Sequence, residues 1–490
     1  MGGALYLKLY DIINNYPLID TYGSLDIEIS TIKHDSRQID KSDLFIAQKG
    51  FNNDGHNFIK KAIKNGAIAV LGENHLNKKG NITQIKVNDS VDALAYLSSN
   101  FYNWPSKKMN MIGITGTNGK TSVSYYIKKI LDTYKLKVGV LGTIGATLDS
   151  ETINLKNTTP DSLVIQELLN RMVRRGIDTC IMEASSHALD LKRVEYIDFD
   201  IGIFTNLSQD HLDYHGTMER YFESKLSLFK KTKKFNIINI DDKYGKIINE
   251  SVQDRVSCIT YGLKESAMVY ASNITYSDKG IKFVLNTPKA STDIKLNIPG
   301  EFSLYNALAA SACSYVLGID IKTIKRGLES FYGVKGRFEF VPNKLGLNII
   351  IDFAHTPEGL EAILKTTKEF VKGKIYIVLG AGGNRDKEKR PKMGEVVGQY
   401  ADLSIITTDN PRFEDPEYII DHIVKGVKKT NGKYVKIVDR RDAIEYAILQ
   451  AEEEDIILLA GKGHETNMII GEDSVLFNER KIVSDIMDKF

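Results

Sequence analysis

The sequence predicts an α/β protein of about three domains, with a central P-loop-type sheet that is doubly wound and mostly parallel. Three observations lead to this expectation. The chain has 490 residues, which is long for a single hydrophobic core. Short apolar runs typical of buried strands alternate with helical patterns along most of it. One such run, from Met111 to Ile114, passes through a glycine turn into a helical pattern with Val123 and Ile127 on one face.

The composition is that of an ordinary globular protein, with 42% apolar and 26% charged residues. The formal net charge of +2 gives no reason to expect nucleic acid or an anionic membrane as the main partner. Three widely spaced cysteines, Cys180, Cys258 and Cys313, suit a reducing compartment, and no apolar run approaches a membrane span. We therefore expect a cytoplasmic protein without membrane insertion or a nucleic-acid partner. We further expect a monomer that acts on small molecules.

The pattern divides into three parts, which we expect at residues 1–107, 108–336 and 337–490. The first and smallest part has short strand and helix patterns, and proline and lysines near residues 104–108 end it. In the second part we expect strands, with helices between them, at 137–141, 179–182, 201–204 and 236–240. In the third part we expect strands at 348–351, 375–379, 403–406, 435–438 and 456–459, and helices after Pro357, after Pro391, at 417–427, at 443–450 and at the C-terminus.

The glycine turn is typical of a phosphate-binding loop, in which backbone N–H groups between a strand and a helix surround phosphate. The loop residues are Gly116, Thr117, Asn118, Gly119, Lys120 and Thr121. In this interpretation Lys120 faces the β- and γ-phosphates and the Thr121 hydroxyl ligates magnesium. The strict spacing of the motif is not met, because Ile114 stands where its first glycine belongs. The alternative is a tight turn with an exposed lysine.

Two strand ends near this loop carry further polar groups. Ligands of parallel sheets bind beyond the carboxyl ends of the strands, so Glu183 is expected at the same edge as the loop, where a carboxylate suits magnesium. Alternatively, this segment is a helix cap formed by Ser185 and Ser186, and both interpretations can hold together. His211 either ligates a metal or satisfies a buried hydrogen bond, which is the commoner case for an isolated histidine.

Lys225 lies on the apolar face of a predicted helix over residues 218–229. Tyr221 and Phe222 precede it by four and three positions, and Phe229 follows it by four. Either its long stem carries the ammonium group out to water, or the amine is partly desolvated, with a lowered pKa, and reactive. The sequence leaves both alternatives open.

Three strand ends of the third part carry charges that could bind a zwitterion with more than one carboxylate. Arg385 and Arg412 are suited to bidentate capture of carboxylates, and Glu465 is suited to an ammonium group. The alternative is a set of solvated charges at loop ends.

Taken together, these motifs resemble those of the Mur ligases, ATP-dependent amide-forming enzymes of peptidoglycan precursor synthesis. Residues 116–121 match the shortened phosphate loop of that family, and the resemblance extends from Asp35, Ser36 and Arg37 to Glu465. The chain is most similar to the members that add the third residue of the stem peptide. The resemblance implies a UDP-binding N-terminal domain, a central ATPase domain and a Rossmann-like C-terminal domain, with ATP and Mg²⁺ as cofactors.

The resemblance also implies roles for individual residues. Ser36 would contact UDP, and contacts to the UDP-muramoyl dipeptide would come from Asn157, Thr158, Thr159, Ser185 and Arg193. Nucleotide contacts outside the loop would come from Asn306, Arg337, Asp352 and His355. The metal positions would be Thr121, Glu183, His211 and a carbamylated Lys225, and the catalytic residues Lys120, Lys225 and His211. Leu191 departs from the pattern, because many relatives carry a substrate-contacting glutamine there.

The resemblance implies that one segment determines which amino acid is added: Asp409, Asn410, Pro411 and Arg412. Arginine in the last position is typical of members that add meso-diaminopimelate, whose second carboxylate would pair with Arg412 and Arg385, and Gly461 and Glu465 would complete the pocket. The implied reaction joins this amino acid to UDP-N-acetylmuramoyl-L-alanyl-D-glutamate through an acyl phosphate. The alternatives are an L-lysine-adding or other Mur-type ligase, a folylpolyglutamate synthetase-like ligase, and a P-loop NTPase that acts as a switch or motor.

Overall fold

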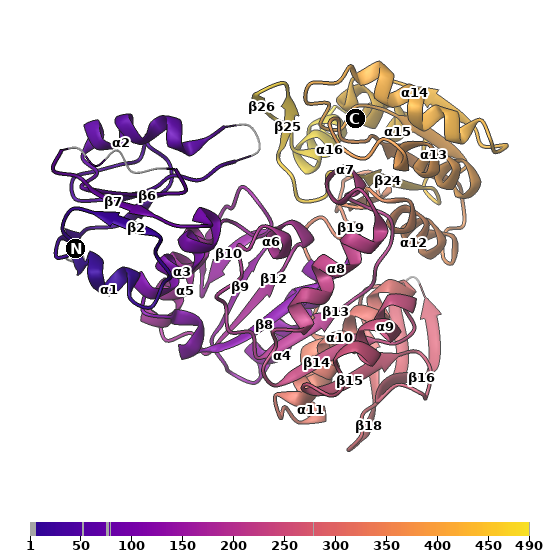
Figure 1. The fold of residues 1–490 in the computed structure, drawn as a ribbon. Helices are drawn as coiled ribbons and strands as arrows, with labels where there is room; N and C mark the ends of the chain where they lie inside the picture. The colour runs from indigo at the N-terminus through magenta and orange to yellow at the C-terminus, as the bar shows by residue number, and fades with distance from the viewer. Residues whose placement is uncertain (1–5, 51–52, 75–77, 79, 278, 490) are drawn as a thin grey trace. The chain divides into compact units, whose positions relative to one another are not determined.

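The computed structural model describes residues 6–50, 53–74, 78, 80–277 and 279–489 (Figure 1). It confirms the α/β class, and the chain forms two compact units. The first unit comprises Met1–Gly113, Lys137–Asp200 and Lys231–Lys233, and the second comprises Ile114–Leu136, Ile201–Lys230 and Lys234–Phe490. The boundaries expected at residues 107 and 336 stay a prediction.

The N-terminal part of the first unit is a five-stranded sheet with helices on both faces. Its strand order is β2 (Asp20–Tyr22), β7 (Thr83–Lys86), β6 (Ala69–Gly72), β5 (Leu44–Ile46) and β4 (Ile32–Lys33). Successive side chains of a strand point to opposite faces, so Leu44 and Ile46 pack in the cluster that includes α1 (Leu9–Ile13) and α3 (Ser90–Phe101), while Phe45 packs with α2 (Ile59–Asn65). Strands β1 (Leu7–Lys8) and β3 (Glu28–Ile29) form a separate antiparallel pair.

The rest of the first unit holds one part of an eleven-stranded sheet. The parallel strands β9 (Val138–Gly142) and β12 (Thr179–Glu183) are buried along their whole length, and β10 (Gly145–Leu148) and β11 (Glu151–Ile153) extend β9 antiparallel. Helices α5 (Ser162–Arg174) and α6 (Ser186–Asp190) flank β12 in the sequence. Strand β8 (Asn110–Thr115), whose residues divide between the two units, stands between β12 and β13 (Ile201–Phe204) in the strand order.

In the second unit, β13, β14 (Phe235–Asn239) and β15 (Ser257–Gly262) are parallel, which agrees with the mostly parallel sheet that the sequence predicts, although the sequence analysis did not identify β15. An antiparallel meander then follows that the sequence analysis did not identify, with strands β16 (Val269–Ser277), β17 (Gly280–Asn286) and β18 (Ser291–Leu296). The helices of this part are α4 (Lys120–Thr133), α7 (Leu212–His215), α8 (Met218–Phe229), α9 (Lys243–Val252), α10 (Glu301–Val316) and α11 (Ile321–Glu329).

The C-terminal sheet is parallel except for its edge strand, β19 (Glu339–Phe340). Its order continues with β20 (Asn348–Asp352), β24 (Ile456–Ala460), β21 (Ile375–Leu379), β22 (Leu403–Ile406) and β23 (Tyr434–Lys436). One face packs against α12 (Pro357–Lys368), α13 (Lys389–Tyr400) and α14 (Pro416–Val427), and the other against α15 (Arg440–Gln450) and α16 (Glu479–Met487) (Figure 1). A short hairpin, β25 (Asn467–Ile470) and β26 (Asp473–Leu476), precedes α16.

Three predicted helix starts in this region were wrong: α14 begins at Pro416 and α15 at Arg440, where we expected residues 417 and 443, and α13 begins before the proline that it was expected to follow. We expected a helix after Pro391, but α13 begins at Lys389 and contains the proline in its first turn. The first N–H groups of a helix have no partner within it, so proline loses no intrahelical hydrogen bond there. The strands at 201–204, 375–379 and 403–406 have the predicted bounds.

Candidate active site

The phosphate loop lies between the end of β8 at Thr115 and the start of α4 at Lys120. Both of its glycines have positive φ, 151° at Gly116 and 88° at Gly119. The backbone N–H of Thr117 donates to the carbonyl of Asn206 at 2.8 Å, and the N–H of Asn118 donates to the Asn206 side chain at 3.0 Å. The loop therefore has a fixed course that ends at the N-terminus of a 14-residue helix, where N–H groups favour phosphate.

Close neighbours require glycine at both positions. A Cβ at Gly116 would overlap Thr205 Oγ1, and a Cβ at Gly119 would lie 2.5 Å from Asn306 Oδ1. Asn306, a predicted nucleotide contact, is buried on α10 and thus approaches the loop. The loop backbone at Gly116 and Gly119 is packed too closely against its neighbours to carry side chains. Its N–H groups can still bind a ligand.

Replacing Gly116 with alanine is expected to lower kcat/KM for ATP by ~10²-fold, because the methyl group would push the loop away from Thr205 and misplace its N–H groups. Steady-state kinetics with varied ATP would measure this. The matched control is Gly176→Ala, which also has a positive φ, 67°, but meets nothing within 4 Å. Wild-type kinetics in Gly116→Ala would contradict the assigned role of the loop.

Two amines meet at one carbonyl group of the loop. The carbonyl oxygen of Gly116 accepts hydrogen bonds from Lys120 Nζ at 2.8 Å and from Lys225 Nζ at 2.9 Å. Lys120 Nζ also donates to the carbonyl of Thr117 at 2.9 Å. Both predicted catalytic lysines are thus held at the phosphate loop.

Lys225 is buried, with 1% of its surface exposed, so its stem does not carry the amine out to water. Its Nζ lies 4.6 Å from the centre of the Tyr221 ring. Burial, with a further contribution from the positive charge of Lys120, holds the pKa of Lys225 well below its usual range. A neutral amine is nucleophilic and can react with carbon dioxide to form a carbamate, so the site fits the modification that the family resemblance implies.

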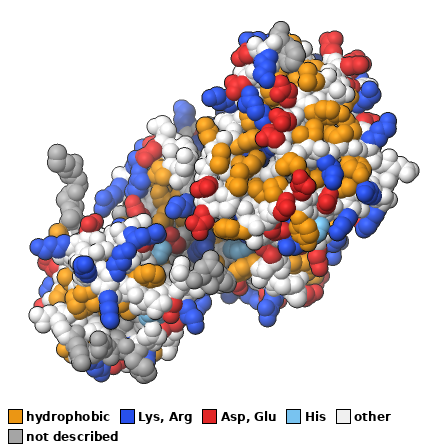
Figure 2. All heavy atoms as spheres, turned by 90° about the horizontal axis from the view of Figure 1, so that it is seen from above, with side chains coloured by type: hydrophobic (Ala, Val, Ile, Leu, Met, Phe, Trp, Pro, Cys, Tyr) orange, Lys and Arg blue, Asp and Glu red, His pale blue; other side chains and the backbone are white. Residues whose placement is uncertain are grey.

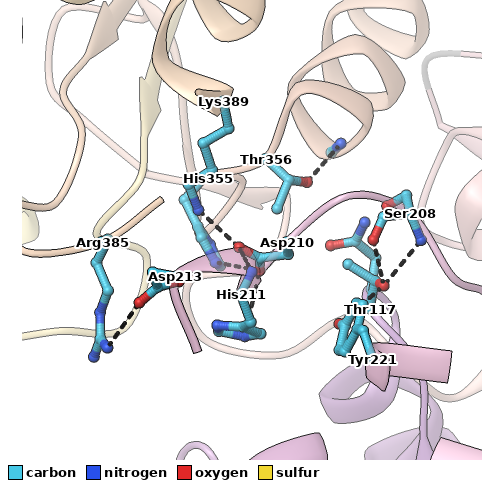
Figure 3. A network of polar contacts seen from close by, with 12 residues as sticks. Thr117, Ser208, Asp210, His211, Asp213, Tyr221, His355, Thr356, Arg385 and Lys389 are labelled. Carbon is cyan, nitrogen blue, oxygen red and sulfur yellow. Dashed lines mark hydrogen bonds and ion pairs between the residues drawn. The ribbon is translucent and has the colours of Figure 1, made fainter. Parts of the chain in front are cut away.

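Asp210 is the centre of a polar network beside the loop (Figure 3). Its buried carboxylate accepts a hydrogen bond from Lys389 Nζ at 2.9 Å, and it lies 3.7 Å from His355 Nε2 and 3.4 Å from His211 Nε2. Burial alone would raise the pKa of Asp210, but the charge of Lys389, with the two histidines, holds it well below its ordinary value. This carboxylate brings together the predicted metal position His211 and the predicted nucleotide contact His355.

Arg337 and Asp352, the other predicted nucleotide contacts, also belong to this region. Arg337 Nη2 donates to Thr121 Oγ1 at 3.2 Å, and the guanidinium lies 4.5 Å from the centre of the Phe353 ring. Asp352 is buried and accepts from the N–H groups of Phe338 and Ala354, both at 2.6 Å. Burial raises the pKa of Asp352.

In the first unit, the predicted dipeptide contacts gather around the end of β12. Thr159 Oγ1 donates to the carbonyl of Glu183 at 2.6 Å and lies 3.2 Å from Ser185 Oγ, and Arg193 donates to the carbonyl of Thr159 at 2.9 Å. The buried Glu183 carboxylate accepts from the N–H and the hydroxyl of Thr143 at 3.0 and 2.9 Å. These contacts hold a carboxylate and several hydroxyl groups in one cluster.

The remaining predicted contacts have different surroundings. Thr158 Oγ1 lies 3.2 Å from Thr143 Oγ1, beside the same cluster. Ser36 is buried and its carbonyl accepts from the side chain of Asn65, whereas Asn157 is exposed. Ser185 Oγ accepts from the Ala188 N–H and so caps α6, which is the alternative role that its sequence context suggested.

The four predicted magnesium positions divide between the units, with Glu183 in the first and Thr121, His211 and Lys225 in the second. Over the ranges that the structure describes, no three His, Cys, Asp or Glu side chains are grouped to hold a metal ion. Magnesium typically keeps waters and phosphate oxygens and needs few protein ligands. A hydroxyl at the helix start and a buried amine with a lowered pKa, able to become an anionic carbamate, fit that donor set.

The predicted amino-acid pocket lies at the ends of three strands of the C-terminal sheet. Asn410 Nδ2 donates to Glu465 Oε2 at 3.0 Å, and Arg412 Nη1 donates to the carbonyl of Gly383 at 2.9 Å. A Cβ at Gly461, where φ is 110°, would lie 2.8 Å from Asp409 Oδ2. Pro411 lies between Asn410 and Arg412 in this loop. Asp409, Asn410 and Pro411 are buried.

The positive charges of Arg385 and Arg412 interact in this predicted pocket. Burial and the nearby charge of Arg385 lower the pKa of Arg412, while Asp409, Glu465 and Asp213 oppose that shift. Arg385 is half exposed and lies 4.0 Å from Asp213. Repulsion between the two guanidinium groups favours an anionic ligand, because a carboxylate close to both would relieve it.

The sequence analysis missed four charged or polar residues that hold these groups: Asp210, Lys389, Lys462 and Thr143. Asp210 directly precedes the histidine that was chosen, and Lys462 stands between two glycines at the end of an apolar strand, so a local signal existed for both. Lys389 had none, because its partner is 179 positions away in the sequence. Thr143 likewise follows a buried strand without any distinctive pattern.

Charged side chains of both signs lie on the surface (Figure 2). Figure 2 shows acidic and basic side chains mixed over the visible face, as expected for a formal net charge of +2. No helix among the described residues combines the length and the apolar character needed to cross a membrane.

Three family models match successive segments of the chain. Residues 28–102 match the Mur ligase family catalytic domain, residues 114–314 the Mur ligase middle domain, and residues 336–463 the Mur ligase glutamate ligase domain. The UDP-N-acetylmuramoyl-L-alanyl-D-glutamate--2,6-diaminopimelate ligase of Caldanaerobacter subterraneus subsp. tengcongensis is 48% identical over 465 residues, which cover 95% of this chain and 96% of that protein.

Solved structures give the same result. A structure of a UDP-N-acetylmuramoyl-L-alanyl-D-glutamate--2,6-diaminopimelate ligase matches with a TM-score of 0.69 at 30% identity, covering 99% of both chains. MurF from Thermotoga maritima, solved in complex with ADP, shares the fold with a TM-score of 0.65 at 20% identity, covering 89% of this chain and 94% of that one. Because family models, a curated relative and a solved structure agree over nearly the whole length, the chain belongs to the Mur ligase family.

Proposed function

We propose that this chain is the ATP-dependent ligase that adds meso-2,6-diaminopimelate to UDP-N-acetylmuramoyl-L-alanyl-D-glutamate, a step of peptidoglycan synthesis. The strong similarity to curated ligases with this activity supports the reaction, and the phosphate loop supports the use of ATP. The three cysteines are free thiols, which supports the cytoplasm as the compartment. We further propose that the protein acts as a monomer.

The observation that carries the choice of substrate is the charge arrangement around Asn410. Arg412 and Arg385 form a site for a carboxylate, and Glu465, held by Asn410, can receive an ammonium group. Diaminopimelate carries a carboxylate and an ammonium group at each end of its chain. Lysine lacks the second carboxylate and would leave the guanidinium charges unpaired. Sites built to bind a polar group can reject an analogue that lacks it by ~10⁴-fold.

In the first half-reaction, the terminal carboxylate of the acceptor attacks the γ-phosphorus of ATP. A bond to the carboxylate oxygen forms as the bond to the ADP oxygen breaks, which gives an acyl phosphate. Lys120 and the N–H groups at the start of α4 stabilise the negative charge of the transferred group. Thr158, Thr159, Ser185 and Arg193 would hold the acceptor, and Asn306, Arg337, Asp352 and His355 the nucleotide.

In the second half-reaction, the neutral amine of diaminopimelate attacks the acyl carbon. The carbon–nitrogen bond forms, the tetrahedral intermediate collapses, phosphate leaves with the carbon–oxygen bond electrons, and the nitrogen loses a proton. The pocket of Asn410, Arg412 and Glu465 contributes by fixing the direction of attack. Thr121, Glu183, His211 and carbamylated Lys225 would hold Mg²⁺, which supplies positive charge next to the phosphate oxygens when it is bound.

One assay tests this proposal: phosphate release from ATP with the UDP-dipeptide and either meso-diaminopimelate or L-lysine. We expect release with both the UDP-dipeptide and diaminopimelate present, and at least ~10³-fold lower kcat/KM with lysine. Equal or better use of lysine would make the chain a lysine-adding ligase. Hydrolysis that needs neither substrate would favour an NTPase switch or motor instead.

A further inference from the structure

Lys462 is a fully buried lysine at the predicted amino-acid pocket. It follows β24 in the sequence Gly461-Lys462-Gly463, and its side chain has no exposed surface. Both neighbouring glycines have positive φ, 110° and 54°, which turns the chain sharply enough to direct the side chain between them inward. Lysine normally keeps its ammonium group in water, so complete burial requires compensating partners.

Those partners are the two polar residues expected to receive the substrate. Lys462 Nζ donates to Asn410 Oδ1 at 3.2 Å and to Glu465 Oε2 at 3.1 Å. Asn410 Nδ2 donates to the same Glu465 oxygen at 3.0 Å, and Asn410 Oδ1 also accepts from the N–H of Ile469 at 2.9 Å. The three side chains form a closed triangle.

The triangle fixes the orientation of both partners. The Asn410 oxygen has to face the ammonium group and the Ile469 N–H, so its amide nitrogen is directed to Glu465. Both bonds to Glu465 fall on Oε2, which leaves Oε1 as the oxygen suited to a substrate ammonium group. About a third of the Glu465 side chain is exposed, whereas Lys462 is fully buried, so of the two only Glu465 can reach a substrate.

The loops that carry the triangle have a second, independent anchor. Arg440 is buried and donates to the carbonyls of Thr408 at 3.3 Å and Ala460 at 2.8 Å, the residues just before the two loops. Its charge is balanced by buried Glu479, which accepts from Arg440 Nε at 2.9 Å. Loss of Lys462 should therefore disturb the pocket without detaching the loops from the sheet.

We propose that Lys462 is a positioning residue for amino-acid selection, which holds the Asn410 amide and the Glu465 carboxylate in the arrangement that receives a substrate ammonium group. It does not touch the substrate itself. This inference rests on the proposed function insofar as Glu465 binds the amino acid, but it does not depend on which diamino acid is used.

The test is Lys462→Met, which keeps the length and apolar bulk of the side chain and removes its charge. We expect KM for the amino acid to rise by about 10- to 100-fold, the usual cost of losing hydrogen bonds to a charged group. KM for ATP, KM for the UDP-dipeptide and the melting temperature should stay close to wild type. The matched control is Lys481→Met, an exposed lysine on α16 of the same domain, which should change none of these values.

A double-mutant cycle separates positioning from a general structural role. If Lys462 acts through Glu465, the double variant Lys462→Met/Glu465→Gln will have the amino-acid KM of Glu465→Gln alone. If Lys462→Met alone fails to fold, the double variant can still be compared with Glu465→Gln, because it has no Glu465 carboxylate left without a partner. Multiplicative effects, an unchanged amino-acid KM, or an equal rise in all three KM values would overturn the inference.

The outcome is distinguishable from failure of the proposed function. If the wild-type protein turns over lysine or another amino acid in place of diaminopimelate, the proposed substrate is wrong, and the cycle is measured with the amino acid that is used. If diaminopimelate is the substrate and Lys462→Met leaves its KM unchanged, the inference fails alone.

Discussion

Lys225→Ala is expected to lower the rate of diaminopimelate-dependent phosphate release by ~10³-fold or more, because it removes the carbamate that would hold Mg²⁺, whose positive charge would stabilise the transferred phosphate. The amine is buried at the phosphate loop, where its lowered pKa favours the neutral, carbamate-forming state. Added bicarbonate should not restore activity, since alanine has no amine to modify.

Two measurements check this expectation. Carbon-13 NMR of wild-type protein in labelled bicarbonate should show a carbamate signal that Lys225→Ala lacks, and steady-state kinetics give the loss of rate. Lys230→Ala is the matched control, because Lys230 follows the same helix but is exposed, with its Nζ 3.7 Å from Glu223 Oε2. A carbamate signal that persists in Lys225→Ala, or full activity of this variant, would refute the assigned role.

Arg412→Gln is expected to lower kcat/KM for meso-diaminopimelate by ~10²- to 10³-fold while changing that for L-lysine far less. Truncating one partner of a desolvated charge pair typically costs about 2–5 kcal/mol, and only diaminopimelate supplies the partner carboxylate. Arg412 is largely buried and its guanidinium bonds to the Gly383 carbonyl, so it is held in place before substrate arrives.

Competition between the two amino acids in one reaction, with product masses measured, reports the change in preference directly. Arg441→Gln, at a partly exposed arginine of α15 whose guanidinium lies 3.9 Å from Asp485, should keep the wild-type preference. An equal loss for both amino acids in Arg412→Gln would show that Arg412 supports the fold of the loop without reading the second carboxylate.

Much of the fold could be predicted because its strands are buried and its helices amphipathic. The run Ile375–Leu379 is apolar throughout and forms a central strand. The helix predicted from the spacing around Lys225, over residues 218–229, has the observed bounds of α8. The meander β16–β18 was not identified, although Ile281, Phe283 and Leu285 alternate with more exposed residues in β17. That signal is weak because only one face of these strands is covered.

The site was predictable wherever a local motif carries it, and unpredictable where charged side chains meet from distant segments. The phosphate loop could be located because its glycines, lysine and threonine lie between a strand pattern and a helical pattern. The contacts of Asp210 with Lys389 and of Asn410 with Lys462 could not, because they join positions that are 179 and 52 residues apart. A buried charged group needs an oppositely charged or hydrogen-bonding partner beside it, and a local sequence pattern does not indicate which distant residue that partner is.

The carbonyl oxygen of Gly116, shared by Lys120 and Lys225, makes the two lysines interdependent. Proximity to one ammonium group makes the other less basic, so neutralising Lys120 by mutation would also raise the proton affinity of Lys225 and slow its reaction with carbon dioxide. A Lys120 variant would therefore lose activity for two reasons: it binds the nucleotide more weakly, and a smaller fraction of its Lys225 is carbamylated. Higher carbon dioxide pressure should restore only the activity lost for the second reason.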